Sequence, residues 1–265
     1  MTTTTGTEHG TNHAPGPGHV AAEGKGTGIR VDRVATGTRV GTRTRVDREG
    51  IGTGSVRRTH PRLAALPLGA GGILLAAGGG LHPHGSGASV DAYLASMLGS
   101  PAWLPSHLLL LLGTALATIG FVTTRRAGVF GPGLRRWLTA AAVGWGLATV
   151  ELVPHLVAAG EADELAQHHS TPVLDLHLAL QVVATPLMGL TGAALAIAVA
   201  CSARTLPAWT LAVPAVLGGL GYAASAPLIA ATGSLAPTVL FPMQAGLALW
   251  LVGTWLRVGI RRAGA

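Results

Sequence analysis

The chain has 265 residues, of which 49% are hydrophobic and only 11% are charged. Soluble domains carry about 25% charged residues, so this composition excludes an ordinary soluble protein and favours a polytopic membrane protein. The formal net charge of +7 would suggest nucleic acid as a partner if the chain were soluble. Here the basic residues lie in the tails and in alternate loops, which predicts a lipid bilayer and no nucleic acid as partner.

Residues 1–60 are rich in Thr, Gly and Arg and contain almost no large apolar side chains. Such a segment cannot bury enough apolar surface to offset its conformational entropy, so it is predicted to be a disordered, basic cytoplasmic tail. The ten Lys and Arg residues up to Arg62 are compatible with contacts to anionic lipid headgroups and equally with a solvated tail.

Six apolar segments follow the tail, and a helix needs roughly 20 apolar residues to cross a bilayer. Residues 61–262 are therefore predicted to form an all-α bundle of six transmembrane helices. A short amphipathic helix is expected around Asp91. Trp103 is expected at the membrane interface, and Pro154 is expected to bend the third span. The predicted spans cover approximately residues 63–81, 105–124, 137–159, 173–201, 207–231 and 237–256.

The positive charges predict the orientation of this bundle. Of the 18 Lys and Arg residues, ten precede the first span, four lie at 125–136, one is Arg204 and three follow the last span. The loops on the opposite side contain none. Because cytoplasmic loops carry the positive excess, the chain is predicted to be a multi-pass cell-membrane protein with both termini in the cytoplasm.

Histidines gather on the other, outer side of this predicted topology. Four of the eleven histidines lie in the tail, and each of the rest falls at the outer end of a span or in an outer loop: His82, His84, His107, His155, His168, His169 and His177. Glu151 precedes His155 by four residues, so the two share one helix face. At about 1.5 Å per residue, Glu151 lies roughly 21 Å above the inner end of its span. An ionisable residue inside a span marks a candidate functional site.

Imidazole and carboxylate donors suit zinc or copper(II), so the sequence favours a transition-metal site. We expect His107, His155 and His177 to bind the ion with Glu151 as a fourth ligand, and His82 or His84 to be substitutes. The spacing of Glu151, His155 and His168 resembles, over eighteen residues, the carboxylate-and-two-histidine pattern in the C subunit of copper membrane monooxygenases. Glu stands here where that family has Asp, and the likeness extends to no other part of the chain.

Two alternatives remain open from the sequence. Two histidines among His107, His155 and His177 are compatible with a b-type haem and electron transfer, although the outer side offers no Lys or Arg for the propionates. The chain is also compatible with a transporter or structural protein without a cofactor, whose histidines are interfacial or respond to pH. In that case Asp175 caps the fourth helix, and Gln181 and Gln244 form hydrogen bonds between helices. No catalytic motif indicates an enzyme, and a homo-oligomer is compatible with the sequence.

Overall fold

The computed structural model describes residues 60–260, and these are predominantly helical. The long helices are α1 (Pro61–Leu81), α3 (Trp103–Arg126), α4 (Arg135–Val157), α6 (Pro172–Ala203), α7 (Leu206–Thr232) and α8 (Ala245–Ile260). The shorter ones are α2 (Val90–Leu98), α5 (Ala162–Ala166) and the 3-10 segments η1 (Pro132–Leu134), η2 (Ala158–Glu161) and η3 (Ala236–Gln244). Six helical segments of the described chain are long and apolar enough to cross a membrane, which confirms the predicted all-α fold. The predicted disordered tail lies outside the described residues.

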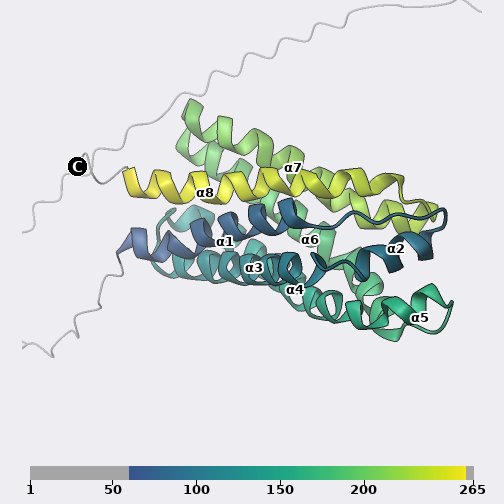
Figure 1. The fold of residues 1–265 in the computed structure, drawn as a ribbon. Coiled ribbons are helices and arrows are strands. Elements are labelled where there is room, and N and C mark those ends of the chain that lie inside the picture. The colour runs from purple at the N-terminus through teal and green to yellow at the C-terminus, as the bar shows by residue number, and fades with distance from the viewer. Residues whose placement is uncertain (1–59, 261–265) are drawn as a thin grey trace, which may run out of the picture. The chain divides into compact units, whose positions relative to one another are not determined.

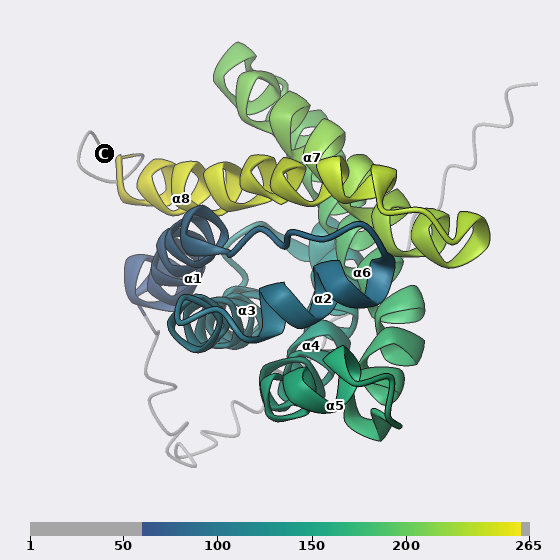
Figure 2. The same ribbon diagram turned by 45° about the vertical axis from the view of Figure 1, so that its right-hand side comes forward.

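The long helices pack into a closed ring in chain order. Helix α1 contacts α3, α3 contacts α4, α4 contacts α6, α6 contacts α7, α7 contacts α8, and α8 returns to α1 (Figures 1 and 2). Helices α2 and α5 pack on each other at the end of the bundle where α4 ends and α6 begins (Figure 1). Large apolar side chains such as Val143, Val150 and Leu217 stay exposed on the outside of the ring. An apolar exterior of this kind fits a lipid bilayer.

The two ends of the bundle differ in charge. The arginines of the described chain gather at the end opposite α2 and α5, where the Arg62 guanidinium donates a hydrogen bond to the Gly259 carbonyl and joins α1 to α8. The α2 and α5 end contains the loop carboxylates and the described histidines other than His60, which precedes α1 at the arginine end. Which end faces the cytoplasm stays a prediction from the positive charges.

Glycines allow α1 and α3 to approach closely. A Cβ atom added to Gly71 would lie 2.7 Å from the carbonyl oxygen of Gly113, so a larger residue at this position would push the helices apart. Nearer the arginine end, the Thr123 hydroxyl donates to the Ala64 carbonyl at 2.6 Å. Because the two helices are antiparallel neighbours, the end of α1 lies beside the start of α3.

Glu161 caps the start of α6. Its two carboxylate oxygens accept hydrogen bonds from the backbone amides of Val173 and Leu174, at 3.0 and 2.8 Å. These amides belong to the first turn of the helix, where no intrahelical acceptor is available. Asp175, the expected cap, lies exposed in the first turn of α6, whereas the hydrogen bonds to the Val173 and Leu174 amides come from Glu161.

Prolines interrupt one predicted span and lie inside another. The sixth span was predicted as a regular helix, but its first nine residues form the 3-10 segment η3 and only then continue as α8. Pro237 and Pro242 lie in this segment and lack the amide proton that an α-helix requires. Pro154 lies in the last turn of α4, which continues to Val157 before the chain passes into η2.

Candidate metal centre

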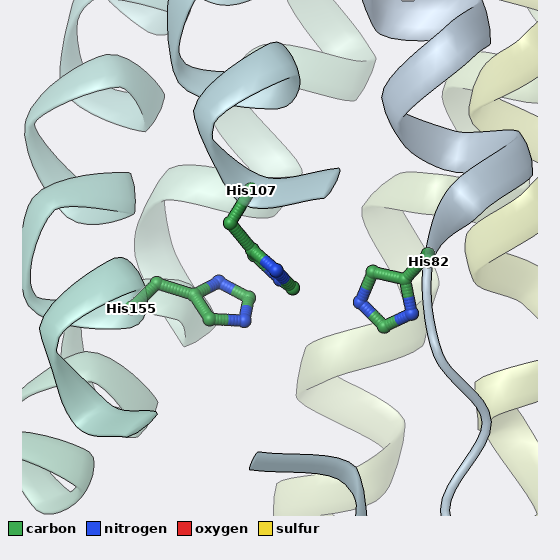
Figure 3. Close-up of side chains that lie close together, drawn as sticks. All are labelled: His82, His107 and His155. Atoms are coloured by element: carbon green, nitrogen blue, oxygen red, sulfur yellow. The ribbon is translucent and has the colours of Figure 1, made fainter. Parts of the chain in front are cut away.

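Four helix ends bring four histidines into one row. His82 follows α1 directly, His107 lies in the second turn of α3, His155 near the end of α4, and His177 in the second turn of α6. Neighbouring ring centroids are 4.9 Å apart for His82 and His107, 4.5 Å for His107 and His155, and 3.8 Å for His155 and His177. Figure 3 shows the rings of His82, His107 and His155 facing one another from three separate parts of the chain.

The carboxylate of Glu151 ends this row, one turn deeper in α4 than His155. Its Oε1 atom lies 2.5 Å from Nδ1 of His177 and 3.7 Å from Nδ1 of His155. The contact with His177 is within ion-pair distance, and it is an ion pair only if that ring is protonated. It does not have the angles of a hydrogen bond, and neither atom has a hydrogen-bond partner within the described chain. Both side chains are buried, with Glu151 5% and His177 4% exposed.

The row contains two groups of three side chains that can hold a metal ion. One group is His82, His107 and His155, and the other is Glu151, His155 and His177. Within each group the ligand atoms lie within 4.8 Å of one another. The ligand atoms of a tetrahedral zinc site are roughly 3.4 Å apart, because each lies about 2.0–2.2 Å from the ion. Both groups are therefore close to the spacing that a metal requires, and His155 belongs to both.

Backbone carbonyls orient two of these rings. Nδ1 of His107 lies 2.7 Å from the Trp103 carbonyl oxygen, and Nδ1 of His82 lies 2.9 Å from that of Pro83. Because a carbonyl oxygen only accepts, each Nδ1 carries the proton and the lone pair of the neutral ring is on Nε2. Metal-binding histidines usually donate their other ring nitrogen in this way. Nε2 of His107 is buried and has no hydrogen-bond partner within residues 60–260.

His82 is neutral near pH 7. Burial lowers the pKa of His82 below its ordinary value of 6.5, and this effect outweighs the hydrogen bond to the Pro83 carbonyl, which raises the pKa. A neutral ring with its proton on Nδ1 presents Nε2 as a free electron-pair donor. His82 is thus in the protonation state that a metal ligand needs.

Trp103 packs against three of the four histidines. Its ring stacks on His107 with centroids 3.8 Å apart, and lies 5.0 Å from the ring of His155 and 6.0 Å from that of His82. Its indole N–H donates to the Leu156 carbonyl at 3.4 Å, which joins α3 to the end of α4. From the sequence, Trp103 was expected only at the membrane interface, although its spacing of four residues from His107 places both on one face of α3.

A layer of apolar side chains closes the centre from the end of the bundle. Trp103 belongs to a buried cluster with residues of α2, α5 and α6, including Leu98, Leu165 and Leu174. This layer limits the access of water to the histidines below it. Electrostatic interactions and metal–ligand bonds in such a site are strengthened by the low local dielectric.

The predicted ligands do not all converge in one place. The preferred set of His107, His155, His177 and Glu151 is divided between the two groups, and His82 joins His107 in the first. His84 and His169 are exposed and belong to neither group. Asp175, Gln181 and Gln244 are also outside both groups.

His168 lies away from the centre, in the loop after α5. It is exposed, and its Nδ1 atom is 3.5 Å from Asp91 of α2. The spacing of Glu151, His155 and His168 therefore does not form a three-ligand group. His168 is thus a loop residue, which is one of the two placements predicted for these histidines.

The donor atoms of the centre are imidazole nitrogens and carboxylate oxygens, and the only cysteine, Cys201, is exposed near the other end of α6. The centre can thus hold an ion that prefers nitrogen and oxygen ligands. Comparisons with protein-family models, curated proteins and solved structures found no match to this chain.

Proposed function

We propose that this protein binds a transition-metal ion, zinc or copper, through Nε2 of His82, His107 and His155 at one end of a six-helix membrane bundle. The observation that carries this proposal is Nε2 of His107, which is buried without a hydrogen-bond partner while Nδ1 is held by the Trp103 carbonyl. A buried polar atom left unsatisfied costs about 1–3 kcal/mol. A metal ion bound to this nitrogen and its two neighbours would remove that cost.

The ligand set favours zinc or copper(II) over metals that prefer thiolate. Imidazole is a common ligand for both ions, whereas copper(I) more often recruits Cys or Met. Three histidines leave a fourth position for water or another ligand, as in catalytic zinc sites. The proposed ion would thus remain open to exchange or to reaction with a small molecule.

The close packing of the rings favours an ion over haem. A haem held by two axial histidines lies between their rings, whereas neighbouring rings here have centroids only 3.8–4.9 Å apart. A macrocycle would have to separate at least two of the four helix ends. A small ion needs only shifts of about 1 Å to reach bonding distance.

Metal analysis of the purified protein tests this proposal. The protein in detergent would be stripped with chelator, reloaded with zinc or copper, passed through a desalting column and analysed by mass spectrometry for metal. We expect the wild type and the control His84→Gln to retain the same amount of metal, and His107→Gln to retain less, because it loses the ion held by His82, His107 and His155. His84 is a matched control because it is an exposed histidine of the same end of the bundle.

Three results would contradict the proposal. The wild type could retain neither zinc nor copper, His107→Gln could retain as much metal as His84→Gln, or the absorption spectrum of the purified protein could show a Soret band. The first would favour a transporter or structural protein without a cofactor. The Soret band would favour haem.

A further inference from the structure

The deeper half of the histidine row contains two buried atoms that no hydrogen bond explains. Oε1 of Glu151 and Nδ1 of His177 lie 2.5 Å apart in an orientation that excludes a hydrogen bond. Both side chains are more than nine-tenths buried. A buried carboxylate needs a cation or hydrogen-bond donors to offset its desolvation. Oε1 of Glu151 and Nδ1 of His177 can each donate an electron pair to a metal ion. Their closeness is the arrangement of two ligands of one ion.

No arginine of the described chain is placed to neutralise Glu151. Those arginines lie at the opposite end of the bundle, at the start of α1 and α4 and at the end of α3, α6 and α8. The titratable groups near the carboxylate are His177, His155 and the partly buried Tyr222 of α7. A divalent ion at this point would supply the positive charge that otherwise requires a protonated His177 or His155.

His155 is placed to serve two ions. Its ring lies between the rings of His107 and His177, with centroids 4.5 and 3.8 Å away. Nδ1 is on the side of Glu151, at 3.7 Å. Figure 3 shows the same ring facing His107 and His82, so its two nitrogens can be shared between the two groups.

We propose that Glu151, His155 and His177 form a second transition-metal site, and that His155 bridges the two ions. The proposal builds on the proposed function, which supplies the first ion at His82, His107 and His155. Two nitrogens and one carboxylate oxygen suit zinc or copper(II). When both ring nitrogens of His155 bind metal, its remaining N–H proton is released to solvent and the ring binds as imidazolate. Glu151 and His177 separate from 2.5 Å to roughly 3.4 Å to admit the ion.

The number of zinc ions per chain tests the second site. With zinc as the probe, the wild type and His84→Gln should retain two ions, whereas His177→Gln and Glu151→Gln should each retain one. His82→Gln should also retain one ion, because the group of Glu151, His155 and His177 stays intact in this variant. Size-exclusion chromatography in detergent identifies any variant that fails to fold.

The second site would be overturned if the wild type retained one zinc ion, His82→Gln none and His177→Gln one. The proposed function would still stand in that case. Neither zinc nor copper in any of these proteins would overturn both.

Copper(II) tests the bridge in the wild type without any substitution. Two copper ions joined by an imidazolate couple their spins, so the spin count from electron paramagnetic resonance should fall below the copper content. In His177→Gln the spin count should equal the copper content. A wild type with two copper ions and a full spin count would overturn the bridge through His155.

Discussion

Replacing Trp103 by leucine should weaken metal binding although Trp103 offers no ligand. The indole stacks on His107 at 3.8 Å, and its N–H donates to the Leu156 carbonyl at 3.4 Å. An aromatic pair contributes about 0.5–1.5 kcal/mol and a hydrogen bond about 0.5–1.5 kcal/mol. Their loss totals about 1–3 kcal/mol, which corresponds to a roughly 5- to 150-fold weaker affinity if the ion must then order the ligand rings itself.

Competition with a chromophoric chelator in detergent measures this affinity. Trp103→Phe keeps an aromatic face but loses the N–H donor, so we expect its loss of affinity to be smaller than that of Trp103→Leu. Trp209→Leu is the matched control, because Trp209 is 40% exposed on α7. A Trp103→Leu variant that folds normally and binds zinc as tightly as the wild type would contradict this prediction. The stacked ring would then not position the ligands.

Three further predictions follow from the same structure. Burial lowers the pKa of His82 below its ordinary value of 6.5, so this ligand stays neutral at neutral pH. Zinc affinity should hold near pH 7 and fall only at pH values below 6.5, as a titration of zinc affinity from neutral to acidic pH would show. Gly246 faces a carbonyl oxygen of α7, whereas a Cβ on Gly80 meets open space. Gly246→Ala should therefore destabilise the protein by about 1–3 kcal/mol, and Gly80→Ala much less. Equal thermal unfolding temperatures of the two variants would contradict this packing. Glu161→Ala removes both amide hydrogen bonds of the α6 cap and should cost about 1–3 kcal/mol, while the exposed Glu164→Ala should be near neutral in the same thermal measurement.

The six spans were predictable because a membrane helix is specified by its own apolar residues. Predicted and observed spans agree within a few residues, for example 105–124 against Trp103–Arg126 for α3. Each backbone group must be satisfied within the helix in a bilayer, so local sequence decides the structure. The exception is η3, where Pro237 and Pro242 prevent the regular α-helix that hydropathy alone predicts.

The composition of the centre was only partly predictable. Helix rise placed Glu151 and the histidines near one depth, but depth does not determine which helices are neighbours. His82 and His84 looked equivalent in the sequence. The chain leaves the helix at His82, which turns the ring toward α3, while His84 continues into the exposed loop. The Glu161 cap was missed because it joins residues twelve and thirteen positions apart through the turn of η2 and α5.

X-ray absorption spectroscopy of the zinc-loaded wild-type protein tests the central claim most directly. The proposed centre predicts nearest neighbours at about 2.0–2.1 Å that are mainly nitrogen, with the outer scattering of several imidazole rings. His107→Gln should weaken this imidazole scattering, and His84→Gln should leave it unchanged. A spectrum with oxygen neighbours only, or a protein that retains no zinc, would contradict a histidine metal centre at this end of the bundle.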